Sequence, residues 1–150
     1  MVRVDIELDG FKELDRALGK LPYEVGTKVL QNAVTSAILP ARKAIYNAAP
    51  IGQDDNRNPE SKSGKIKLKY GKLRENIKKR KSRTYSDKSK SAYISTGDAF
   101  WGFFLEFGTR YIPATRWFSK AFESAQNEML AKLKKDLARG IEKKFKELTK

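Results

Sequence analysis

The segment of residues 100–109 reads FWGFFLEFGT and is the most informative stretch of the chain. Half of the aromatic residues of the protein lie between residues 100 and 118, and the one acid among them is Glu106. Aromatic side chains bury large areas and pack with directional preference. The stretch, with Phe104 and Phe107 near its centre, therefore predicts a core nucleus, a protein interface, or both.

Glu106 is expected to have a specific partner. The pattern predicts a helix over residues 99–107, with Asp98 as its N-cap and Gly108 as the left-handed residue after its end. An anion near a helix C-terminus is disfavoured by the macrodipole, and an unpaired carboxylate among apolar rings is costly. The nearest cations in sequence are Arg110 and Arg116. A carboxylate that points to solvent is the alternative.

The residues that follow predict one long C-terminal helix. Apolar residues recur at helical spacing after Thr115, which is the expected N-cap. At about 1.5 Å per residue the helix would be about 45 Å long, more than a domain of this size can cover. Its distal half, from about Lys134 onward, is therefore expected to project or to pack on a neighbouring subunit, and Gly140 to soften the helix there.

The N-terminal third predicts a strand and then helices. Apolar and polar residues alternate over residues 2–8, and a Gly turn and a short helix over residues 11–19 follow. A helical apolar stripe runs over residues 23–49 and contains Pro40. Because proline removes a backbone donor and clashes with the preceding turn, a kink near Leu39 or two consecutive helices are expected.

The middle of the chain predicts a loop and a hairpin. Residues 51–70 are polar and look like a mobile loop insertion, in which residues 65–70 could form a short exposed strand. Residues 77–85, which are rich in lysine and arginine, and residues 92–95 are expected to form the two strands of a solvated or edge hairpin. The fold class is thus α+β within a single domain over residues 1–150. It should contain a small antiparallel sheet packed against long helices, a long C-terminal helix and a mobile basic loop or hairpin.

The positive charge is concentrated in one segment. The formal net charge is +14, and residues 57–90 carry +11 of it, from fourteen Lys and Arg against three acids. This segment could contact nucleic acid by neutralising phosphates, contact an acidic protein, or remain a solvated loop. The cations singled out are Lys78, Lys79, Arg80, Lys81 and Arg83.

The composition argues against several classes of site. The chain has no cysteine and no histidine, which removes disulfides, thiolate metal sites and the commonest general base. Asp54 and Asp55 are interpreted as solvated loop acids. We therefore expect no enzyme, no catalytic residues, no cofactor and no metal. No apolar run approaches the ~20 residues of a membrane span, so we expect a soluble protein made in a cytoplasm with no membrane partner.

The aromatic stretch also resembles the signature of a tailed-phage neck and tail-completion family, named for gene product ten of a lambdoid coliphage. The matching residues are Glu106-Phe107-Gly108-Thr109, then Pro113-Ala114, Trp117-Phe118 and Ala121. Upstream, residues 4–18, 41–50 and 71–77 are similar to the family's opening, helix end and Gly-x-Leu segment. The chain lacks the family's second proline in residues 115–118, and Lys120 replaces the third.

The resemblance implies a structural virion protein of a long-tailed bacteriophage or prophage. It would form a homo-oligomeric ring of six or twelve subunits in the neck, between other phage head-connector and tail proteins, with DNA passing through the lumen. The protein would then reside in the virion, and in the host cytoplasm during assembly. The structural and interface candidates are Phe104, Glu106, Phe107, Gly108, Thr109, Arg110, Pro113, Arg116, Trp117 and Phe118. The alternative function is a basic nucleic-acid-binding module, and a histidine-free enzyme is a remote third.

Overall fold

The computed structural model describes residues 11–51, 73–82 and 90–149. The expected strand over residues 2–8, the loop over 51–70 apart from Ile51, and its short strand over 65–70 lie outside these residues. In chain order the elements are α1 (Phe11–Gly19), α2 (Tyr23–Ala37), α3 (Leu39–Ala48), η1 (Leu73–Asn76), β1 (Lys78–Lys81), β2 (Ala92–Ser95), α4 (Trp101–Phe107), α5 (Trp117–Ser124) and α6 (Gln126–Leu148).

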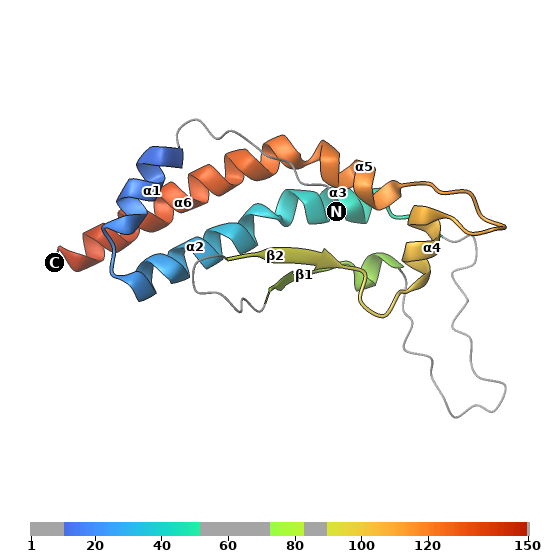
Figure 1. Cartoon of the computed structure of the whole chain (residues 1–150), viewed down its shortest axis with the longest axis horizontal. Coiled ribbons are helices and arrows are strands. Elements are labelled where there is room, and N and C mark those ends of the chain that lie inside the picture. Colours follow the sequence, from blue (N-terminus) through green and yellow to red (C-terminus); the bar gives the residue numbers. More distant parts are fainter. Residues whose placement is uncertain (1–10, 52–72, 83–89, 150) are drawn as a thin grey trace, which may run out of the picture.

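The helices form two long parallel lines, which makes the molecule elongated (Figure 1). One line is α2 followed by α3, and the other is α6 with α5, so that α2 packs on α6 and α3 packs on α5. The small sheet lies against the α2–α3 line, and α4 lies beyond the end of the sheet. The expected α+β class, with a small antiparallel sheet against long helices, is confirmed.

The predicted interruption near Leu39 is confirmed as two consecutive helices. Pro40 lies in the first turn of α3, where a missing backbone N–H costs no hydrogen bond. Ile38 joins the two helices with φ −80° and ψ −2°, and its carbonyl accepts the Arg42 N–H at 3.0 Å. The chain therefore changes helix without a loop.

Two hydrophobic clusters hold the lines together. The first joins α3, η1, α4 and α5 through the buried residues Ile45, Ala49, Leu73, Ile77, Ala99, Trp117 and Ala121. The second joins α1, α2 and α6 through Leu21, Val29, Ala33, Leu137 and Ile141. Full burial of one Leu or Ile side chain stabilises the fold by about 1.5–3 kcal/mol, so both clusters contribute substantially.

The C-terminal segment differs from the prediction in two ways. It forms two helices, because the chain breaks helical geometry at Ala125 (φ −92°, ψ −3°) between α5 and α6. Its distal half does not stand free, since Leu137 and Ile141 are buried in the second cluster, while Leu148 at the end of the stripe is 56% exposed. The expectation was wrong because α2 and the short helix α1 both pack on this part of α6.

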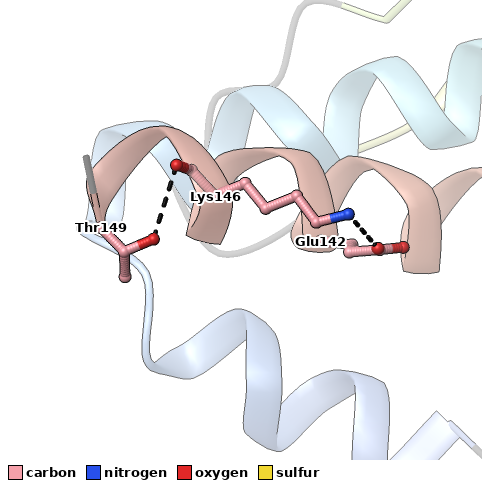
Figure 2. A network of polar contacts seen from close by, with 3 residues as sticks. All are labelled: Glu142, Lys146 and Thr149. Carbon is pink, nitrogen blue, oxygen red and sulfur yellow. Dashed lines mark hydrogen bonds and ion pairs between the residues drawn. The ribbon is translucent and has the colours of Figure 1, made fainter.

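Gly140 is a close-packing position rather than a flexible one. A Cβ atom there would lie 2.8 Å from Val29 Cγ1 of α2. The absence of a side chain allows α6 to approach α2 closely. Farther along α6, Lys146 Nζ and Glu142 Oε1 form an exposed ion pair at 2.6 Å (Figure 2).

The sheet is a two-stranded antiparallel ribbon. Lys78 pairs with Ser95 and Lys81 with Ala92, and the predicted range of β2 is confirmed. The strand predicted over residues 77–85 is confirmed only for Lys78–Lys81, since Ile77 and Ser82 lie outside β1 and residues 83–85 lie outside the described part.

Candidate interaction surface

Helix α4 presents aromatic rings to solvent and buries its acid. Phe103 and Phe107 are 62% and 61% exposed, Phe104 is 41% exposed, and Phe100, just before the helix, is also exposed. The buried residues of α4 are Gly102 and Glu106. Of the two roles predicted for the aromatic stretch, Phe104 and Phe107 therefore take the surface one. The core role falls to Trp117, which is buried, and to Trp101 and Leu105, which pack against the first cluster.

The exposed rings contact one another. Phe103 and Phe107 have ring centroids 4.6 Å apart, and Phe104 lies edge-on to both Phe100 and Phe103 at 6.0 and 6.4 Å. We call these four residues the α4 aromatic face. Contiguous exposed apolar patches on soluble proteins usually mark interaction sites, whereas single exposed rings are ordinary. The α4 aromatic face is therefore the leading candidate for a functional surface among the described residues.

Glu106 caps the N-terminus of α5 from a distance of eleven residues along the chain. Its carboxylate accepts hydrogen bonds from the backbone N–H groups of Phe118 at 2.7 Å and Ser119 at 3.1 Å, and from the Ser119 hydroxyl. These are the second and third helical residues, whose N–H groups an N-cap side chain normally satisfies. The positive end of the helix dipole also favours the charge.

The prediction that Glu106 pairs with Arg110 or Arg116 is wrong. In the described part of the chain neither Arg110 nor Arg116 forms an ion pair with it, and both side chains are exposed. Arg116 instead occupies the residue before α5 in a left-handed conformation (φ 51°, ψ 33°). Arg110 lies over the Tyr111 ring at 5.9 Å. Glu106 pairs with backbone N–H groups of α5 and not with an arginine side chain, because the helix holds these N–H groups in place next to the carboxylate.

Thr115 forms hydrogen bonds to the C-terminal end of α4 and does not cap the start of α5. Its N–H and its hydroxyl both donate to the Leu105 carbonyl, at 3.0 and 2.7 Å. The Arg116 N–H donates to the Glu106 carbonyl at 3.1 Å. These bonds satisfy carbonyl groups that the last turn of a helix leaves free. The prediction that Thr115 caps the N-terminus of the last helix is therefore wrong, and Glu106 caps α5 instead.

Gly108 and Thr109 close a compact turn between the helices. Gly108 has φ 78°, and a Cβ there would lie 2.8 Å from the Ala114 nitrogen. The Thr109 N–H donates to the Ile112 carbonyl at 2.8 Å, and the Thr109 hydroxyl accepts the N–H groups of Tyr111 and Ile112. Gly108 has the predicted positive φ, but its ψ of 171° is extended and not that of the left-handed residue expected there. Pro113 and Tyr111 lie exposed on this turn.

The start of α4 also differs from the prediction. The helix begins at Trp101, and Asp98 forms no side-chain cap. Residues 96–100 form a turn instead, in which the Ala99 N–H donates to the Thr96 carbonyl at 3.0 Å and Gly97 has φ 55°. This turn places Ala99 in the first cluster.

Gly102 and Ser119, which the sequence analysis did not single out, also hold α4 in place. The Trp117 indole N–H donates to the Gly102 carbonyl at 3.3 Å, and a Cβ at Gly102 would lie 2.9 Å from Leu73 Cδ1. Ser119 supplies two donors to Glu106. A serine in the first turn of a predicted helix is a weak signal for such a contact, and no local pattern indicates the partner. Phe118 packs edge-on to Trp117 at 5.5 Å.

The basic candidates lie apart from the α4 aromatic face. Lys78, Lys79, Arg80 and Lys81 form β1 and are all exposed, and Arg83 lies outside the described residues. The ribbon lies along the α2–α3 line, and α4 lies beyond its end (Figure 1). The structure thus presents two separate surfaces, one aromatic and one basic.

Comparisons with protein-family models, with curated proteins and with solved structures gave no match. Within residues 11–51, 73–82 and 90–149 no helix is long and apolar enough to cross a membrane. In the same ranges no group of three or more acidic side chains is placed to hold a metal ion. Asp54 and Asp55 lie outside them.

Proposed function

We propose that this protein is a structural subunit of the neck of a long-tailed bacteriophage or prophage, where copies of it assemble into a ring between head-connector and tail proteins. The observation that carries the proposal is the α4 aromatic face, four mutually contacting rings exposed on a firmly anchored helix. The resemblance of residues 106–121 to the neck and tail-completion signature supports it.

The contacts that hold α4 in place favour a role in subunit assembly over a catalytic role. Glu106, Gly108 and Thr115 all act between α4 and α5, where they fix the direction in which the rings point. A surface whose backbone is held in advance loses little conformational entropy when it binds. Aromatic residues are also enriched at protein interfaces. In this proposal the signature residues hold α4 and α5 in a fixed arrangement, so that the exposed rings can contact a neighbouring subunit.

Complementation of a phage that lacks the gene tests this proposal. Phe103→Ser removes one exposed ring of the α4 aromatic face, and Tyr23→Ser removes a ring of equal exposure, 62%, on α2. We expect the first to reduce the yield of tailed virions and the second to leave it unchanged. Equal yields from both variants would contradict the proposal.

The alternative function, a basic nucleic-acid-binding module, is favoured by the exposed cations of β1. It predicts a different outcome for the same variants. If binding to nucleic acid were the whole function, Phe103→Ser would retain it in full, because α4 lies apart from the ribbon.

A further inference from the structure

The two faces of the β1–β2 ribbon differ in what they contact. Arg80 pairs with Tyr93 and Lys78 with Ser95, and directly paired side chains leave an antiparallel ribbon on the same face. Ile94, which pairs with Lys79, packs against the first hydrophobic cluster. Lys78, Arg80, Tyr93 and Ser95 therefore form the face turned away from the core. We call it the outer ribbon face.

The ribbon is anchored at both ends. Arg42 Nε of α3 donates to the Ile77 carbonyl at 3.0 Å, just before β1. Gln31 Nε2 of α2 donates to the Ser91 carbonyl at 3.3 Å, just before β2. The Ser82 N–H also donates to the Ser91 carbonyl, at 3.0 Å. The outer ribbon face is thus carried by a supported backbone.

The charge of the ribbon is unbalanced. All four residues of β1 are cations and all are exposed, and β2 contains no acid. In the described part of the chain no ion pair or side-chain hydrogen bond engages these four cations. Tyr93 is 49% exposed between them. The ribbon therefore concentrates positive charge that the fold itself does not use.

We infer that the outer ribbon face binds the phosphate backbone of duplex DNA. Residues two apart on one face of a strand are about 6.6 Å apart. This is comparable to the through-space distance between adjacent phosphates of one DNA strand, because the ~3.4 Å axial rise per phosphate is accompanied by a lateral shift as the strand winds. Lys78 and Arg80 can therefore meet phosphates of one strand while the Tyr93 hydroxyl donates to another phosphate oxygen. Lys, Arg and Tyr are among the residues that commonly contact phosphates.

An acidic protein fits this face less well. Protein interfaces are depleted in lysine at their centres and are built around apolar anchors. Protein–DNA interfaces are polar and strongly positive, as the outer ribbon face is. This binding site goes beyond the proposed role in ring assembly and does not depend on it, since it rests on β1 and β2 and not on α4.

The test is a titration of a labelled random-sequence duplex with the full-length protein, followed by fluorescence anisotropy at several salt concentrations. The ribbon variant is Lys78→Gln with Arg80→Gln. The matched control is Lys12→Gln with Arg16→Gln, which removes the same charge from exposed positions on α1. Each phosphate contact contributes about 0.9 to the log–log salt slope. We expect the ribbon variant to lose about 1.8 from the magnitude of the slope and the control to keep it.

Two further variants separate charge from fold. Lys78→Arg with Arg80→Lys keeps both charges and should retain the slope. Tyr93→Phe removes one hydrogen bond and no charge, so it should weaken binding by about threefold to tenfold at unchanged slope.

Three results would overturn the inference. The first is a lack of salt-dependent binding by the wild-type protein. The second is an equal change of slope in the ribbon variant and in the α1 control, which would mean that net charge alone drives binding. The third is displacement of the duplex by polyglutamate as readily as by unlabelled duplex, which would identify a site for acidic polymers in general.

Discussion

At the scale of single residues, the fold around α4 depends on contacts that hold two helices at a fixed angle. Glu106 is 5% exposed, and its carboxylate satisfies two backbone donors of α5. A buried acid next to exposed phenylalanines is the reverse of an ordinary amphipathic helix. The inversion is explained by the position of the α5 N-terminus directly behind α4.

Replacement of Glu106 by alanine should therefore destabilise the protein. The change leaves the Phe118 and Ser119 N–H groups without their acceptor, and loss of an N-cap typically costs about 0.5–2 kcal/mol. The control is Glu123→Ala, an exposed acid of α5 that should change stability by less than about 0.5 kcal/mol. Urea denaturation measures both. Equal midpoints for the two variants would show that the cap is not a stabilising contact.

Gly108→Ala should destabilise the turn after α4. The residue has φ 78°, and the added Cβ would lie 2.8 Å from the Ala114 nitrogen. With ψ at 171°, the residue lies in a backbone region that is essentially restricted to glycine, so the conformational strain alone is worth about 1–3 kcal/mol, and the close contact adds to it. Gly19→Ala is the matched control, because nothing lies within 4 Å of its Cβ position. Thermal unfolding should show a lower midpoint for the first variant and an equal or higher one for the second.

At the scale of elements, local signals predicted most boundaries. Pro40 indicated the break between α2 and α3, and Gly108 indicated the end of α4. Each of these signals lies within a few residues of the boundary. The break at Ala125 was missed, because the apolar stripe continues across it without a proline or glycine.

The packing of α6 required information that no single segment carries. Its distal stripe was predicted to be exposed, yet Leu137 and Ile141 are buried by α2. The packing of α2 and α1 on this part of α6 decides this, together with the close approach at Gly140. Pattern within α6 shows which face is apolar but not what covers it.

Ile141→Ala should accordingly destabilise the monomer. The side chain is 5% exposed, and truncation of a buried isoleucine to alanine costs about 2–5 kcal/mol. Leu148→Ala is the control, since Leu148 is 56% exposed and should contribute less than about 1 kcal/mol. Chemical denaturation compares them. A change in stability of less than about 1 kcal/mol for Ile141→Ala would indicate that the distal half of α6 is an exposed interaction surface, as the sequence predicted. Deletion of residues 140–150 should likewise impair folding.

The α2–α6 contact also predicts a dependence on pH. Interaction with the Ser36 side chain, and then with Lys132, lowers the pKa of Asp136 below its ordinary value of 3.8, against the opposing effect of partial burial. Lys132 Nζ lies 3.1 Å from Asp136 Oδ2, as an ion pair without hydrogen-bond geometry. Because the folded pKa is depressed, the carboxylate stabilises the fold above its unfolded pKa. That stabilisation is lost as the pH falls through the folded pKa.

Asp136→Asn should therefore flatten the acid limb of the stability profile. We expect the free energy of unfolding to fall less between about pH 6 and pH 3 in the variant than in the wild type. Glu142→Gln is the control: its pKa is lowered by a hydrogen bond and the charge of Lys146, but the pair is exposed and screened by solvent. Parallel profiles for wild type and Asp136→Asn would contradict the assignment.

At the scale of the whole molecule, the fold class followed from the order of elements, whereas the site did not. The sequence indicated that Glu106, Gly108 and Trp117 matter, and the structure places all three in the frame between α4 and α5. It could not indicate that Phe104 and Phe107 face solvent, because the same ring spacing fits a core helix. The partner of Glu106 was missed because proximity in sequence favoured the arginines.

The central claim is that the α4 aromatic face is open in the single subunit and covered when subunits assemble. Hydroxyl-radical footprinting read by mass spectrometry tests it directly, on the free protein and on purified particles. We expect Phe103, Phe104 and Phe107 to react in the free protein and to be protected in the particle, while Tyr23 reacts in both. Unreactive rings in the free protein, or equal reactivity in both states, would contradict the account.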